Sequence, residues 1–295
     1  MTEAVAVQPG ESEGQQDTGV PRSLKIGALV SFVAAMGVLL IGGLFNRNQV
    51  PPYPERITSG GEVIAEKDSI LRGQHVYQRY GLMDHGSVWG HGSLRGMDFS
   101  AQTLHLVGEA IRERISQERF DAPYEALSRT DRAVVDALVL DDIKTNTYDP
   151  STGELVISPA KAEAFREVRA YWDQVFGEGE MAHGFLPGTV KTAQERADIA
   201  AFFFWTAWAA GTNRPGLNYT YTNNWPADRS VGNTAPDQAI VWSFAGIFAL
   251  FVVLGLVIYV VHRYRFFYGE PRLVHLAERV AEAPISVSQS KSAKF

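Results

Sequence analysis

Two long runs of apolar residues stand out from a chain in which polar and apolar residues are otherwise mixed. The first, Ile26–Phe45, and the second, Ile240–Val261, contain no charged residue. At about 1.5 Å per residue, a helix of this length spans roughly 30 Å, the thickness of the hydrocarbon core of a bilayer. Trp242 and Tyr259 lie near the ends of the second run, where interfacial aromatic residues gather. The pattern predicts two transmembrane helices.

The basic residues that flank these runs predict the orientation of the chain. On the side of the two termini the flanks carry five basic residues, which are Arg22, Lys25, His262, Arg263 and Arg265. On the side of the long loop that joins the two runs, only Arg47 lies close to the first run, and no basic residue closely precedes the second. Positive residues favour the cytoplasmic side. Both termini are therefore expected in the cytoplasm, with the membrane crossed twice and the long loop outside.

Helical spacing of apolar residues predicts that this loop is a mainly α domain. Five helices are expected, at Asp68–Tyr80, Ser100–Gln117, Tyr124–Leu140, Pro159–Phe176 and Ala193–Ala210. A Gly-rich loop, Gly81–Gly96, separates the first two, and Thr145–Val156 carries turn residues. The last helix is rich in aromatic residues, which are Phe202, Phe203, Phe204, Trp205 and Trp208.

These patterns divide the chain into five parts. Residues 1–22 form a polar, Gly-rich tail that is expected to be disordered. The first transmembrane helix takes residues 23–46, the outer domain residues 47–237, and the second transmembrane helix residues 238–262. Residues 263–295 hold a basic, aromatic stretch and a short amphipathic segment, Pro271–Ala283, and are expected to be a cytoplasmic connector.

Composition removes several kinds of chemistry. The chain has 295 residues, a formal net charge of -6 and no cysteine. Without thiols it can form no disulfide, no thiolate metal site, no iron–sulfur cluster and no covalently attached haem c. The mild acidity, without a clustered basic face, argues against a nucleic-acid partner. Packing and hydrogen bonds alone must therefore hold the outer domain together.

The Gly-rich loop contains most of the candidate functional residues. His85 and His91 have the chemistry of metal ligands, but no carboxylate or second histidine pair stands at helical i, i+4 spacing beside them. Structural or interface roles are therefore favoured over a metal site. Arg95 and Asp98, three residues apart, are expected to form an ion pair rather than an acid/base couple. Trp225, in an Asn-Trp-Pro sequence, is a further interface candidate, and no catalytic, cofactor-binding or metal-binding residue is predicted.

The order of residues around His85 resembles a known family. A Tyr-Gln pair, a short gap, a Cys-x-x-Cys-His motif, a Gly-rich loop and an apolar helix follow one another in the small cytochrome c subunit of the cytochrome-dependent nitric oxide reductases. In this chain Gly81 and Asp84 stand at the two cysteine positions and His85 at the histidine position. A cytochrome c-like domain without haem attachment is typical of the quinol-dependent nitric oxide reductases. A second stretch, Thr192–Pro226, is similar to the same family in its aromatic helix and closing Asn-Trp-Pro.

The resemblance runs from Leu24 to the C-terminus and implies that the membrane is the inner membrane of a bacterial cell. It implies the N-terminal part, or a small subunit, of a quinol-dependent nitric oxide reductase, a denitrification enzyme that converts two NO to N2O and water. In that family the catalytic half is a twelve-helix domain of the haem–copper oxidase superfamily, which holds haem b and non-haem iron. The present chain lacks intramembrane histidines for such centres, so the catalytic half is expected as its partner, beside membrane lipids, and quinol is reached only indirectly.

The resemblance also implies how the outer domain manages without a cofactor. The aromatic residues of the last predicted helix are expected to fill the volume of the missing haem. The domain would then give structural support to the catalytic half and cover it. Whether the loop His91–Asp98 touches a calcium ion shared with that half stays open.

Two other functions stay open from the residues alone. One is a two-span membrane sensor whose extracytoplasmic domain binds a ligand. Sensors of this kind usually continue into a long heptad-patterned cytoplasmic helix, whereas Pro271 and Pro284 interrupt the segment after the second apolar run. The other is an assembly factor that never joins the mature enzyme, which copurification would distinguish.

Overall fold

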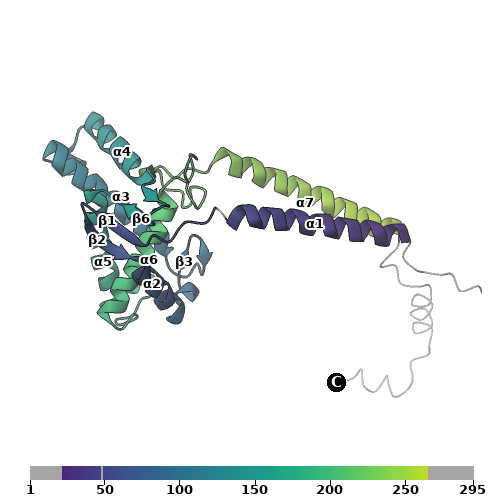
Figure 1. Cartoon of the computed structure of the whole chain (residues 1–295), viewed down its shortest axis with the longest axis horizontal. Helices are drawn as coiled ribbons and strands as arrows, with labels where there is room; N and C mark the ends of the chain where they lie inside the picture. The colour runs from purple at the N-terminus through teal and green to yellow at the C-terminus, as the bar shows by residue number, and fades with distance from the viewer. Residues whose placement is uncertain (1–21, 48, 265–295) are drawn as a thin grey trace, which may run out of the picture.

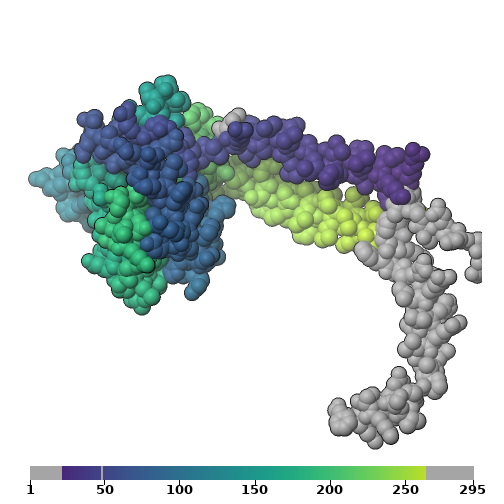
Figure 2. Space-filling model, turned by 60° about the horizontal axis from the view of Figure 1, so that its bottom comes forward, coloured from purple at the N-terminus to yellow at the C-terminus, as the bar shows by residue number. Residues whose placement is uncertain are grey.

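The computed structural model describes residues 22–47 and 49–264, and the chain is mainly helical over these residues, as predicted. Two long helices, α1 (Arg22–Arg47) and α7 (Asp237–Tyr264), leave the same side of a domain formed by the residues between them (Figure 1). They still lie alongside each other when the molecule is turned (Figure 2). Of the disordered tail predicted at 1–22 the structure describes only Arg22, which begins α1. Of the cytoplasmic connector predicted at 263–295 it describes only residues 263 and 264, which end α7. The rest of both segments, with the amphipathic segment predicted at Pro271–Ala283, lies outside the described residues.

Both long helices have the length and composition of membrane-spanning helices. Their apolar side chains are exposed along the whole length, for example Leu39 at 67% and Phe248 at 71%. A continuous apolar surface of this size is stable only against lipid or against other apolar helices. The two helices therefore fit insertion into a membrane.

All five helices predicted for the loop are present, as α2 (Lys67–Arg79), α3 (Phe99–Phe120), α4 (Arg129–Lys144), α5 (Pro159–Gly177) and α6 (Ala193–Gly211). The predicted start of α4 at Tyr124 is wrong. Tyr124–Ala126 forms a separate 3-10 turn, η2, and α4 begins after Ser128, whose hydroxyl accepts a hydrogen bond from the Asp131 amide at 3.2 Å. The first amides of a helix have no backbone partner, and the side chain of Ser128 can accept a hydrogen bond from one of them, whereas that of Pro123 cannot. The helix therefore starts after Ser128.

The sequence did not predict the small sheets. Four strands form one sheet in the order β2-β1-β6-β5, and they are β1 (Arg56–Ser59), β2 (Glu62–Glu66), β5 (Tyr148–Asp149) and β6 (Glu154–Val156). β1 pairs parallel with β6, with Ile57 opposite Leu155. The predicted turn residues of Thr145–Val156 do form a turn, which joins β5 to β6. Within the Gly-rich loop, β3 (Ser87–Val88) and β4 (His91–Gly92) form a hairpin.

Helix α6 is the centre of the domain, and every residue from Asp198 to Gly211 is buried. It packs most closely on α2, at Gly73, where an added Cβ would lie 2.1 Å from the carbonyl oxygen of Asp198. Arg72 closes the same contact with two hydrogen bonds to the Asp198 carboxylate, from Nε at 2.9 Å and from Nη2 at 3.1 Å. Helices α3 and α5 cover the rest of α6, so the core lies among these four helices.

Candidate functional site

His85 lies at the end of a tight turn that follows α2. Gly81 has a left-handed φ of 63°, the 3-10 helix η1 (Leu82–Asp84) follows, and His85 comes directly after it. Its ring centroid lies 4.4 Å from that of Phe185, and its Nε2 donates a hydrogen bond to the carbonyl of His183 in η3 (Met181–His183). The imidazole is therefore turned toward the segment that precedes α6, and one of its two nitrogens is already bonded there.

Five aromatic side chains fill the interior behind His85, and we call them the aromatic plug. They come from α3, α5, α6 and the loop after η3, and they are Phe99, Trp172, Phe176, Phe185 and Phe203. Each is at most 2% exposed. Phe99 stacks on Phe203 with ring centroids 4.7 Å apart, and Phe176 meets Phe185 edge to face at 5.3 Å. Ring contacts of this kind add to the free energy gained by burial of the rings.

Most of the aromatic residues predicted to fill the volume of a missing haem lie outside the plug. Of that set only Phe203 belongs to the plug. Phe204 packs on Phe165, Trp205 stacks on Tyr53, Phe202 contacts Tyr77, Phe203 and Trp205, and Trp208 lies near Tyr221. Because α6 is buried on all sides, its side chains point to different neighbours, and most of the plug comes from elements distant in sequence.

The predicted ion pair between Arg95 and Asp98 is wrong. Asp98 is the N-cap of α3 and accepts a hydrogen bond from the Ala101 amide at 2.8 Å. Its two carboxylate oxygens also accept from both neighbouring serine hydroxyls, Ser87 and Ser100, and from the Gly90 amide. These donors already satisfy the carboxylate. Arg95 is exposed, and within residues 49–264 its guanidinium forms no ion pair.

The β3–β4 hairpin turns through Trp89 and Gly90, whose φ angles are 54° and 76°. A two-residue hairpin with both central φ angles positive has the type I′ geometry, which matches the twist of its strands but strains a tryptophan. Two hydrogen bonds hold Trp89 there. Its ring Nε1 donates to the Thr206 carbonyl at 2.8 Å, and its backbone amide donates to the Ser100 hydroxyl at 2.9 Å.

His91 and Trp225 both lie at this hairpin. His91 is exposed on β4, and its Nδ1 donates to the Trp89 carbonyl at 2.9 Å. The ring of Trp225 covers the turn, since a Cβ added at Gly90 would lie 3.3 Å from Trp225 Cζ2. The structure thus brings His91, Asp98 and Trp225 to one hairpin, whereas His85 faces the plug and Arg95 faces solvent. Over the described residues no three His, Asp or Glu side chains are arranged to hold a metal ion.

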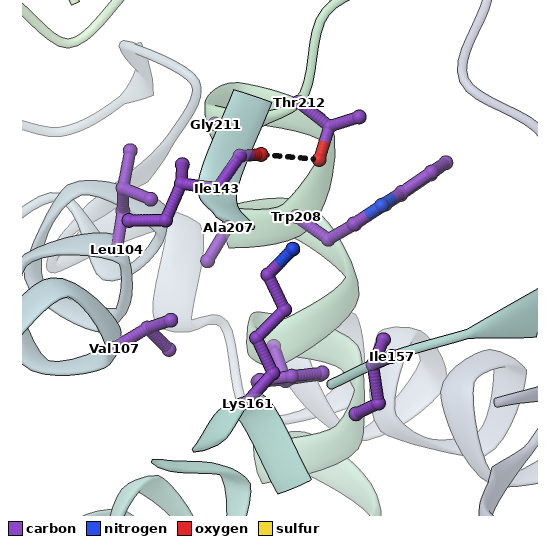
Figure 3. A pocket seen from close by; sticks show the side chains of 10 residues that line it. Leu104, Val107, Ile143, Ile157, Lys161, Ala207, Trp208, Gly211 and Thr212 are labelled. Carbon is purple, nitrogen blue, oxygen red and sulfur yellow. Dashed lines mark hydrogen bonds between the residues drawn. The ribbon is translucent and has the colours of Figure 1, made fainter. Parts of the chain in front are cut away.

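Lys161 has a role that the sequence did not reveal. It is 6% exposed and points into a small apolar pocket between α3, α4 and α6 (Figure 3). Its Nζ donates to the carbonyl of Asp142, whose carboxylate Oδ1 lies 3.4 Å away, in the last turn of α4. Burial lowers the pKa of Lys161, and the ion pair with Asp142 opposes that effect. A cation at a helix C-terminus is favourable, so Lys161 joins the start of α5 to the end of α4.

The residues around His85 do not fit a covalently bound haem c. Such a haem needs two thiols before the axial histidine, and the chain has no cysteine, with Gly81 and Asp84 at those positions. The space on the side of the His85 ring is taken by Phe185 and the rest of the plug, and its Nε2 is bonded to a backbone carbonyl. The domain keeps the order of elements around the histidine while its interior is closed by side chains.

Comparison with known families agrees with this geometry. The family model of the NorB cytochrome c-like domain, a domain of nitric oxide reductase, matches residues 54–227. No curated protein matches the chain. The matched segment is more than half of the chain and contains His85, the aromatic plug, the β3–β4 hairpin and Trp225. The chain therefore belongs to the family of the cytochrome c-like domain of the nitric oxide reductase NorB.

Proposed function

We propose that this chain is the haem-free N-terminal part, or a small subunit, of a quinol-dependent nitric oxide reductase. The overall reaction is 2 NO + 2 H⁺ + 2 e⁻ → N2O + H2O, carried out in the catalytic half. This chain contributes no redox centre. It supports the catalytic half with α1 and α7 and covers it with the outer domain.

The closed interior behind His85 is the observation that carries this proposal. A cytochrome c-like domain that held haem would pass electrons from a soluble cytochrome to the catalytic half. Here the thiols are absent and Phe185 occupies the side of His85 that faces the core. Electrons therefore enter the catalytic half without crossing this domain, and a membrane-soluble two-electron donor such as quinol reaches that half directly.

The proposed location is the inner membrane of a bacterial cell, crossed twice, with both termini in the cytoplasm. The basic residues Arg22, Lys25 and Arg263 on the terminal flanks of α1 and α7 support this orientation. The two helices leave one side of the domain and run alongside each other, which is the arrangement that two spans with one outer domain require (Figure 1).

The test is to produce the full chain with and without the catalytic half in membranes that are free of other NO reductases. The chain alone is expected to show no haem absorbance and no NO consumption. With the catalytic half it is expected to copurify in one-to-one ratio, and NO consumption is expected with a hydroquinone donor but not with reduced cytochrome c.

Two outcomes would contradict the proposal. Equal hydroquinone-dependent activity of the catalytic half without this chain, together with no copurification, would favour a separate sensor. A requirement for the chain during production, with no trace of it in the purified active enzyme, would identify an assembly factor.

A further inference from the structure

We propose that a cavity beside the β3–β4 hairpin is the anchor pocket for the catalytic half, which inserts one bulky apolar side chain into it. The pocket has a volume of about 230 Å³ and lies between the segment that follows α1, the helices α2 and α6, and the hairpin. The residues that the argument uses are Tyr53, Gln78, Met83, Trp89, His91 and Trp205. This inference rests on the proposed function and names the surface through which the two halves meet.

The position of the pocket selects the partner. Tyr53 follows the end of α1 by only six residues. Figure 1 shows β3 on the side of the domain from which α1 and α7 leave. A protein embedded in the same membrane beside these helices therefore faces the pocket, whereas a soluble partner on the far side does not.

The walls of the pocket are fixed before any partner arrives. The Tyr53 ring stacks on Trp205 with centroids 4.1 Å apart, and Trp205 Nε1 donates to the Pro52 carbonyl at 2.9 Å. The ring centroid of Trp89 lies 5.4 Å from that of Trp205, and the hydrogen bond from Trp89 Nε1 to the Thr206 carbonyl holds the ring in place. Preformed walls lower the entropic cost of binding. The strained φ of Trp89 is explained if its ring must be presented here, since such strain persists mainly at functional sites.

The chemistry of the pocket selects an apolar occupant. Its walls are mainly aromatic, with Gln74, Thr206 and the unpaired hydroxyl of Tyr77 as polar members, and no Asp, Glu, Lys or Arg lines it. Gln78 and His91 are exposed and make a polar rim. Met83, which lines the pocket, is itself 48% exposed, and outside the rim Leu94 at 91% exposure extends the apolar surface along the same loop. An aromatic pocket within an apolar patch, bounded by polar residues, is the arrangement of an interface hot spot.

Because the chain has no cysteine, single-cysteine variants give a direct test. Gln78→Cys places a thiol at the rim. Gln174→Cys is the matched control, an exposed glutamine on α5, which lies on the side of the domain away from α1 and α7 (Figure 1). Each full-length variant is labelled with a maleimide in detergent, with and without the bound catalytic half, and the labelled peptide of this chain is quantified by mass spectrometry.

The labelling rate of the Q78C variant is expected to fall about tenfold or more when the catalytic half is bound, while that of Q174C stays the same. A second pair of variants fills the pocket from its rim. Gln78→Trp is expected to reduce recovery of the catalytic half about tenfold, and Gln174→Trp is expected to leave it unchanged, with both variants melting at the wild-type temperature.

The failures of the two proposals are distinguishable. Equal labelling of Q78C in the free chain and in an active, copurified complex would overturn the anchor pocket and leave the proposed function standing. Protection of Q78C by a lipid extract alone, without the catalytic half, would overturn it in favour of a small amphiphile. Failure of the wild-type chain to bind the catalytic half would contradict the proposed function, and the anchor pocket would then have no partner.

Discussion

Val231 fills a notch that Gly108 leaves open in α3. A Cβ at position 108 would lie 2.7 Å from Val231 Cγ1, and Val231 is fully buried. Val231 ends η4 (Arg229–Val231), in the short connector between the domain and α7. His105 holds the start of the same connector, with Nδ1 3.2 Å from the Asp228 carboxylate. The contact between Gly108 and Val231 therefore attaches the second long helix to the core.

Substitution of Gly108 by alanine is expected to lower the free energy of unfolding by about 1–3 kcal/mol, because the added methyl group overlaps Val231. Val231→Ala removes the obstacle. The double variant is therefore expected to be less destabilised than the sum of the two single variants, as measured by urea unfolding of the full chain in detergent. Gly246→Ala in α7, where no heavy atom lies within 4 Å of the new Cβ, serves as the control. Additive effects at 108 and 231 would show that the contact does not matter.

Removal of the Phe185 ring is expected to destabilise the domain strongly. The ring is 2% exposed and lies between His85 and the other rings of the plug. Phe185→Ala should cost about 3–5 kcal/mol, the range found for a large cavity in a packed core. Leu186→Ala, at a neighbouring side chain that is 63% exposed, should change stability by less than about 0.5 kcal/mol. Similar melting temperatures for the two variants would contradict a closed interior.

Restoration of the thiols tests the plug in another way. The double variant Gly81→Cys with Asp84→Cys recreates a Cys-x-x-Cys-His order ending at His85. When it is produced together with a cytochrome c maturation system, the variant that carries haem is expected to lose native packing, because Phe185 and its neighbours fill the space. Gly81→Ala with Asp84→Ala is the control for the strain that any side chain meets at the left-handed φ of Gly81. Haem staining and protease resistance of the same sample decide the question. A variant that carries stoichiometric haem and keeps wild-type protease resistance would show that the interior can open.

Because Lys144 is partly buried, the free energy of unfolding is expected to depend on pH in the alkaline range. Burial lowers its pKa from 10.5 to about 8, and its Nζ donates to Asn233 Oδ1. Between these two pH values the unfolded chain binds more protons at this residue than the folded chain, so the contribution of Lys144 to stability rises with pH from about 8 to about 10.5. Lys144→Met should flatten this rise in pH-dependent urea unfolding, whereas Lys191→Met, at an exposed lysine, should not. An unchanged slope in the Lys144 variant would refute the assignment.

The helices could be predicted from the sequence because their signals are local. Apolar spacing located α2, α3, α5 and α6 to within a few residues, and uninterrupted apolar runs located α1 and α7. The sheet could not be predicted, since its strands are two to five residues long and β1 pairs with a strand far along the chain. Strand pairing over such a distance leaves no periodic signal in either segment.

The residues of the candidate site could be named from the sequence, but their contacts could not, for the same reason. His91 and Trp225 lie at one hairpin, but nothing in their spacing indicates the contact of Trp225 with Gly90. Sequence proximity suggested that Arg95 pairs with Asp98, whereas the helix N-terminus that follows supplies stronger local donors for that carboxylate. The plug depends on Trp172 and Phe185, which lie far from His85 in sequence and join it only in the folded domain.

The parallel pair β1–β6 constrains the order in which the domain can be built. Arg56 and its partner Glu154 are separated by about one hundred residues. During synthesis the hairpin of β1 and β2 is therefore made first, and one edge of β1 stays unpaired until β6 has been synthesised. An unpaired edge of this kind recruits other nascent chains. A truncated gene product that stops before Glu154 should therefore aggregate rather than accumulate as a folded intermediate, and a chaperone that shields the hairpin should raise the yield of the whole chain.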